Sequence, residues 1–154
     1  MATNTHAHDQ ARIQMAEITR MIEALDIDYD DLAELREATN LDEPDSAYRD
    51  GMLATADECE SLDDAERRIQ EHPLSLQLRS GWYTPGSTPE AKEFELLLCT
   101  GGPAVRIIGE LDDYQPSRAE IEYQDWGTPW TKCLLSDDEE DVLLQYCNQF
   151  YFGD

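Results

Sequence analysis

The spacing of apolar residues changes at His72-Pro73, and this change limits the folds open to the chain. Before it, Ile18, Met21, Ile22 and Leu25 recur at the spacing of one helical face. After it, Leu74, Leu76 and Leu78 alternate with polar residues, as in a strand with one buried face. The sequence therefore predicts an α+β protein, with a helical arm over residues 1–72 and a sheet over residues 73–154. The two parts could also form one continuous domain.

Four helical stretches are expected in the first part. The apolar period predicts a helix over about residues 9–25, an interruption over 26–31 and a restart at Leu32 and Leu35. A turn around Pro44 separates this from a helix over about 46–58. Ser61 then has the features of an N-cap for a short helix that ends at His72-Pro73.

The second part predicts an antiparallel sheet of about four strands, covered by a C-terminal helix. After the leucine strand, apolar runs over 94–100 and 104–109 are joined by Gly101-Gly102-Pro103, a plausible hairpin connection. A fourth alternating strand covers 119–123. Ser136 and Glu139 form a capping box that opens the last helix.

Charge and composition exclude several classes of function. The chain has 154 residues with 35 acidic and 11 basic side chains, a net charge of −24. Nucleic acid and anionic membranes are poor direct partners, because binding to either depends on Lys and Arg. No apolar run approaches the roughly 18 residues that span a bilayer, and the polar stretch 1–10 lacks the features of a signal peptide. We therefore expect a soluble, cytoplasmic protein.

The residues that could carry catalysis are few. The four cysteines are far apart and form no metal or redox motif, so we expect reduced, buried thiols and no cofactor or metal. His6 and His8 are expected on a frayed terminus, and nothing in the sequence brings His72 to Cys99. Trp82, Tyr114, Trp126 and Trp130 are expected to fill the core and its rim, with a recognition loop over residues 124–130 as the alternative. A small enzyme with a site near Cys99 and the Trp126–Trp130 loop remains an alternative.

One acidic stretch has the spacing of a calcium-binding loop. Asp26, Asp28, Asp30, Glu34 and Glu37 fall at positions 1, 3, 5, 9 and 12 of such a loop. However, Asp31 occupies the position where the sharp turn requires glycine, and the residues after it have helical spacing. The pattern therefore favours a helix over a metal site.

The acidic residues are bunched in the first part. Residues 26–45 contain nine acids and one base, Arg36, and residues 57–66 contain six acids. Carboxylates three or four residues apart on a helix repel each other, yet lie about 5–6 Å apart, comparable with phosphates along a nucleic-acid strand. A rigid array of this kind would resemble a nucleic acid to a basic groove. The predicted partner-binding residues are Asp26, Asp28, Asp30, Asp31, Glu34, Glu37, Asp42, Glu43, Asp45, Asp57, Glu58, Glu60, Asp63 and Asp64.

These acids predict a non-enzymatic inhibitor that occupies the nucleic-acid groove of a basic protein or complex. The alternative is a regulatory protein adapted to high salt, since Lys occurs only twice. Salt adaptation would scatter the acids evenly, whereas here they are bunched, which favours a binding face. The sequence leaves the oligomeric state open, and a dimer is possible.

Four segments of the chain carry a resemblance. Residues 79–82 (Arg-Ser-Gly-Trp), 97–105, 122–130 and 149–153 resemble a family of small acidic proteins encoded on phages, plasmids and integrative elements of proteobacteria. The resemblance covers roughly the second half, and the first half is similar only in its acidity. It implies a counter-defence role in which a CRISPR or restriction nuclease is blocked, and it brings no catalytic residues.

Overall fold

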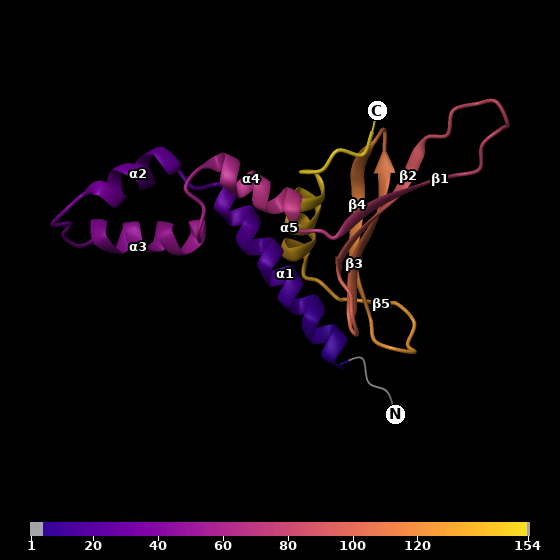
Figure 1. Cartoon of the computed structure of the whole chain (residues 1–154), viewed down its shortest axis with the longest axis horizontal. Coiled ribbons are helices and arrows are strands. Elements are labelled where there is room, and N and C mark those ends of the chain that lie inside the picture. Colours follow the sequence, from indigo (N-terminus) through magenta and orange to yellow (C-terminus); the bar gives the residue numbers. More distant parts are fainter. Residues whose placement is uncertain (1–4, 154) are drawn as a thin grey trace.

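The computed structural model describes residues 5–153 and shows helices followed by an antiparallel sheet and a C-terminal helix (Figure 1). The α+β class is confirmed, but the sheet has five strands because the two-residue strand β5 joins its edge. The elements are α1 (Thr5–Leu25), α2 (Tyr29–Glu37), α3 (Asp45–Ala56), α4 (Leu62–Glu71), β1 (Ser75–Ser80), β2 (Ala91–Cys99), β3 (Ala104–Asp112), β4 (Gln115–Gln124), β5 (Thr131–Lys132) and α5 (Asp137–Cys147). Among the described residues, no helix has the length and apolar character needed to cross a membrane.

The strands follow each other in sequence order across the sheet, and every neighbouring pair is antiparallel. The β2–β3 connection contains Gly101 and Gly102, whose φ values of 101° and 141° suit glycine. Gly109 lies opposite Phe94 in the register of β2 and β3, where the phenyl ring leaves no space for a side chain. The predicted hairpin is confirmed.

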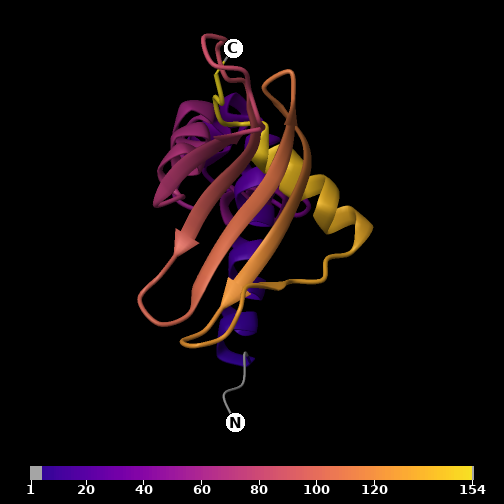
Figure 2. The same cartoon turned by 90° about the vertical axis from the view of Figure 1, so that its right-hand side faces the viewer.

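All helices lie on one side of the sheet, and its other face is open (Figure 2). Helices α1 and α5 pack against β4, and their buried side chains share one core with the inner face of the sheet. The predicted capping box at Ser136 is present, and Arg12 of α1 donates to the Glu139 carboxylate at 2.7 Å. This contact ties α1 to the start of α5. The amino-acid composition changes between α4 and β1, but the buried side chains of α1 belong to the same core as those of the sheet. The change in composition therefore does not divide the core.

Several apolar residues expected in or around the core lie at the surface. Leu74 and Leu78 are 60% and 46% exposed because β1 is an edge strand, whereas α1 packs beneath β3 and β4. The expectation that the aromatic loops close the core is wrong for Trp82 and Trp126, which are fully and 82% exposed. Two expectations about the first helix also change. Helix α1 begins at Thr5 and not near residue 9, and His6 and His8, expected on a frayed terminus, are therefore helical.

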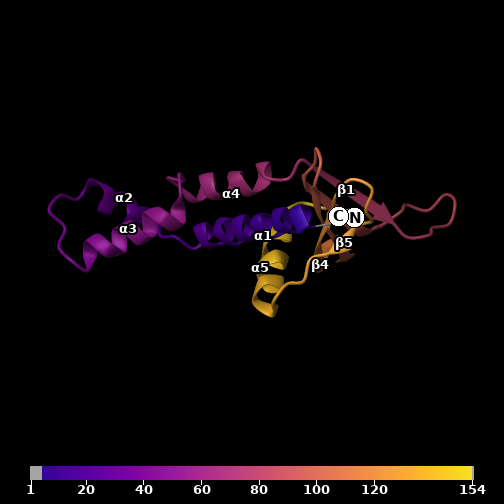
Figure 3. The ribbon, with the colours of Figure 1, turned by 90° about the horizontal axis from the view of Figure 1, so that it is seen from below.

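Helices α2 and α3 form a hairpin that projects away from the sheet (Figures 1 and 3). We call residues 26–58 the acidic hairpin. Leu32, Met52 and Ala56 form its small buried core and are 1%, 6% and 0% exposed. This cluster shares no buried residue with the main core. The hairpin is therefore a folded projection with apolar packing of its own.

Candidate functional site

Local hydrogen bonds shape the acidic hairpin. Asp28 is the N-cap of α2, and its carboxylate accepts from the backbone N–H of Asp31 at 3.0 Å. The Tyr48 hydroxyl of α3 donates to the Asp31 carboxylate at 3.2 Å, and this hydrogen bond raises the pKa of Tyr48. Asp28 and Asp31 therefore have structural roles in addition to their charge.

One face of α2 carries a row of exposed carboxylates. Each helical residue turns by about 100°, so Asp30, Glu34 and Glu37 fall on one side of α2, opposite the buried Leu32. Asp30 and Glu34 are separated by four residues, which places their side chains about 5–6 Å apart. Within the part of the chain that the structure describes, no basic side chain pairs with any of the three. This face is therefore an uncompensated row of negative charge.

The other predicted residues divide into unpaired and paired groups. In the turn between α2 and α3 and at the ends of α3 and α4, several are exposed and have no basic partner among residues 5–153: Asp42, Glu43, Asp45, Glu58 and Asp63, together with Asp26 before α2. Three others form ion pairs with nearby arginines, namely Asp57 with Arg68 at 3.2 Å, Glu60 with Arg36 at 3.7 Å and Asp64 with Arg67 at 3.5 Å. The paired carboxylates offer a partner less net charge than the unpaired ones.

The carboxylates of the sheet are arranged differently. On its open face, Arg106 donates to Glu95 and Glu122, both at 2.7 Å, and its guanidinium stacks 4.1 Å from the ring centre of Trp130. Lys132 lies 3.5 Å from Glu120. The open face thus has mixed, mutually compensating charge. From residue 26 to residue 64, by contrast, fifteen acids face two bases, a balance of −13 out of the total of −24.

The acidic hairpin is connected to the body by specific contacts. The Tyr29 hydroxyl donates to the backbone carbonyl of Ala24 at 2.7 Å, across the junction of α1 and α2. Arg36 donates to the carbonyl of Cys59 at 3.3 Å, between α3 and α4. A small cluster of Ala24, Cys59 and Ala65 is buried beside these bonds. These contacts fix the direction in which the hairpin projects, and no pattern in the sequence indicates them.

The stretch with calcium-loop spacing is helical. Helix α2 begins at Tyr29, so Asp30, Glu34 and Glu37 point outward from one helix face and do not surround a common centre. Among the described residues, no group of three or more His, Cys, Asp or Glu side chains could hold a metal ion.

Among residues 5–153, the structure does not bring a base to Cys99. Burial raises the pKa of this thiol, which makes it a weaker nucleophile. His72 lies elsewhere: its Nδ1 is 2.7 Å from the Tyr146 hydroxyl, and its Nε2 is 2.9 Å from the amide oxygen of Gln14. Cys59, Cys133 and Cys147 are buried free thiols, as expected, while Cys99 is half-buried.

Comparison of the chain with known protein families, curated proteins and solved structures gives no significant match. The resemblance of residues 79–82, 97–105, 122–130 and 149–153 to acidic proteins of mobile elements therefore stays a prediction.

Proposed function

We propose that this protein is a non-enzymatic inhibitor whose acidic hairpin occupies the nucleic-acid groove of a basic partner. The observation that carries the proposal is the row of unpaired, exposed carboxylates on a folded projection. Asp30, Glu34 and Glu37 present one negative charge every few ångströms along α2, as phosphates do along a strand. Guanidinium and ammonium groups that bind phosphates would contact these carboxylates in the same way.

A preformed array favours binding. The carboxylates stand on a helix that is capped by Asp28 and packed through Leu32 against α3. Less conformational entropy is lost when a partner binds such an array than when it binds a disordered acidic segment. The hairpin also projects from the body, so it can enter a groove that excludes the sheet (Figure 1).

The distribution of charge favours mimicry over adaptation to salt. Outside residues 26–64, twenty acids and nine bases occupy 115 residues, and arginines such as Arg106 neutralise the carboxylates of the sheet. A general adaptation gives no reason for leaving the α2 face uncompensated. The resemblance stated above suggests that the partner is a CRISPR or restriction nuclease complex.

The test uses a triple substitution that leaves the helix cap intact. Asp30→Asn, Glu34→Gln and Glu37→Gln remove three charges from α2 and retain side-chain size. The matched control, Asp138→Asn, Glu140→Gln and Asp141→Asn, removes the same charge from exposed positions of α5 on the body. Each protein is immobilised and exposed to a proteobacterial lysate, and the bound proteins are eluted with a salt gradient and identified.

We expect the wild type and the α5 control to retain the same nucleic-acid-binding protein, and the α2 variant to lose it. Elution should need only moderate salt, because exposed charges are screened within about 10 Å at 0.1 M. Retention of one partner by all three proteins would refute the assignment of the α2 face. Capture of partners that bind no nucleic acid would refute mimicry itself.

A further inference from the structure

The outer edge of β1 is open. This strand is the first of the sheet, and of the described elements only β2 makes extensive contact with it. Within residues 5–153, the backbone N–H and C=O groups that point away from β2 have no backbone partner. Such a row of unpaired groups can pair with the backbone of another strand. The edge of β1 can therefore accept a further strand.

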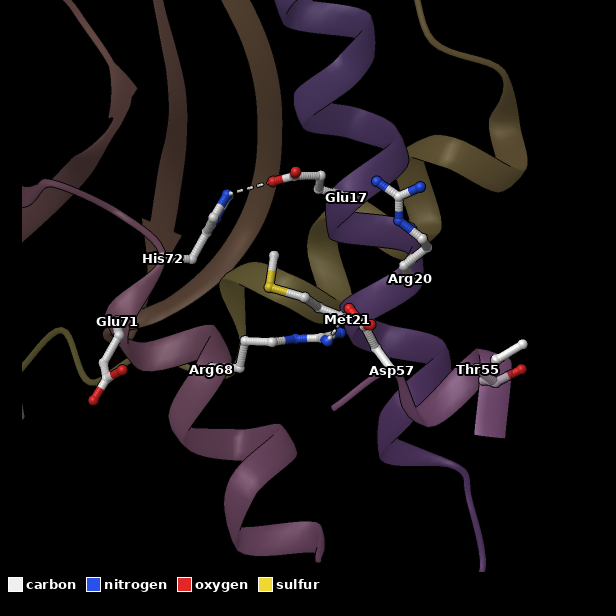
Figure 4. A pocket seen from close by; sticks show the side chains of 9 residues that line it. Glu17, Arg20, Met21, Thr55, Asp57, Arg68, Glu71 and His72 are labelled. Atoms are coloured by element: carbon white, nitrogen blue, oxygen red, sulfur yellow. Dashed lines mark hydrogen bonds and ion pairs between the residues drawn. The ribbon is translucent and has the colours of Figure 1, made fainter. Parts of the chain in front are cut away.

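The helix-facing side of β1 is also uncovered. The chain enters β1 from α4, whose C-cap residue His72 lies against α1, with its Nε2 3.6 Å from the Glu17 carboxylate (Figure 4). This contact holds the end of α4 beside α1, and α1 packs beneath β3 and β4. By the alternation of a strand, Leu74 and Leu78 lie on the same side as Leu76, which contacts the main core. They are nevertheless 60% and 46% exposed, so another chain could cover them.

The charge of this edge suits a second copy of the chain. Each copy carries a net charge of −24, so two copies repel each other wherever carboxylates meet. Residues 74–80 contain one charged side chain, Arg79, which forms an ion pair with Glu93. At the far edge of the sheet, β4 carries Pro116, Arg118 and Glu120, and proline and charges at an edge oppose strand pairing. Of the two edges, β1 is therefore the one at which copies can approach.

We infer that β1 pairs antiparallel with β1 of a second copy, so that two five-stranded sheets form one continuous sheet in a symmetric dimer. The regular part of β1, residues 75–79, is centred on Gln77, and a two-fold axis beside Gln77 pairs all of it. Leu76 then lies opposite Leu78 of the second copy, and Ser75 lies opposite Arg79. The leucines of the two copies cover each other on the side of the helices. A slip of one residue would place leucines opposite polar side chains.

Sedimentation equilibrium of the full chain tests for the dimer, at protein concentrations of about 1–200 µM in low and high salt. We expect a dimer dissociation constant below about 100 µM. This constant should fall as salt rises, because salt screens the repulsion between two acidic copies. Capture of a basic partner by the acidic hairpin should show the opposite dependence on salt. The dimer and the proposed inhibition can therefore fail independently.

Hydrogen exchange of the wild-type protein locates the contact without any substitution. Exchange of the backbone amides of β1 should slow as the protein concentration rises through the dissociation constant. Exchange at the free part of the far edge, residues 115–120 of β4, should not depend on concentration.

Leu78→Lys is the main variant, since it places a charge where Leu76 of the second copy would lie. The 46% exposure of Leu78 should allow the monomer to fold, which thermal unfolding checks. Dimerisation should weaken at least about tenfold. Leu134→Lys is the matched control, because it makes the same change at an 81% exposed leucine between β5 and α5, and it should dimerise like the wild type.

Three results would each overturn the inference. The first is a wild-type protein that stays monomeric at about 200 µM in both salts. The second is dimerisation of Leu78→Lys as tight as that of the wild type. The third is concentration-dependent protection in another part of the chain and not in β1.

Discussion

Leu32→Ala should open the acidic hairpin without unfolding the body. Leu32 is 1% exposed and forms a buried cluster with Met52 and Ala56, against which partly buried side chains of the same hairpin pack (Ile27, Tyr29, Leu35 and Leu53). Removing three buried carbons costs about 2.4 kcal/mol at roughly 0.8 kcal/mol each, and the cavity raises the total to about 3 kcal/mol. This raises the equilibrium constant for opening the hairpin on the order of a hundredfold.

Hydrogen exchange of backbone amides measures this opening directly. In Leu32→Ala we expect faster exchange throughout α2 and α3, and unchanged exchange in β3. The comparison variant is Leu143→Ala, which removes the same side chain from a 0% exposed position of α5 in the main core. It should accelerate exchange in the sheet. Equal acceleration of sheet and hairpin amides in Leu32→Ala, or unchanged exchange in the hairpin, would refute the view that the hairpin has its own core.

Three further predictions concern the stability of the folded chain. Gly109→Ala should destabilise the protein by about 3 kcal/mol or more, because the added methyl group would overlap the paired strand. Gly51→Ala, in open space on α3, should instead stabilise the protein by about 0.5–1 kcal/mol, and thermal unfolding of the two variants measures the difference. The hydrogen bond from Arg12 lowers the pKa of Glu139, so the stability that this bond gives is present at pH 7 and is lost as the pH falls below about 4.3. Glu139→Gln should lower the free energy of unfolding by about 1 kcal/mol at pH 7 and by little at pH 3, as measured by urea unfolding. Burial lowers the pKa of His72 in the folded protein, so on acidification the imidazole is protonated in the unfolded chain at a higher pH than in the folded one. Stability should therefore fall as the pH drops below about 6.5. Melting temperatures of His72→Asn should depend less on pH over this range.

The sequence predicts the elements whose signals are local. The apolar period of α1, the Ser61 and Ser136 caps and the hairpin at Gly101-Gly102 are set by residues close together in the chain, and all are found. Strand β5 was missed because two residues have no periodicity. The exposure of Leu78 and Trp82 was missed because burial depends on which strand lies at the edge and where α1 packs.

In the candidate site, too, the sequence predicts the features set by neighbouring residues and not those set by tertiary contacts. Sequence spacing identified the carboxylates of α2, and the structure places Asp30, Glu34 and Glu37 on one exposed face. Sequence spacing did not indicate that Asp57 is paired with Arg68. It also gave no sign that His72 meets Tyr146, since these residues are 74 positions apart and only the tertiary fold brings them together.

The central claim is that the hairpin carboxylates take the place of phosphates, and competition for the partner's groove tests it most directly. The purified partner is loaded with its labelled nucleic acid, and the wild-type protein is titrated in at several salt concentrations. The account predicts complete displacement of the nucleic acid, an affinity that falls as salt rises, and no displacement by Asp30→Asn/Glu34→Gln/Glu37→Gln. A ternary complex that keeps the nucleic acid bound, or an affinity independent of salt, would contradict it.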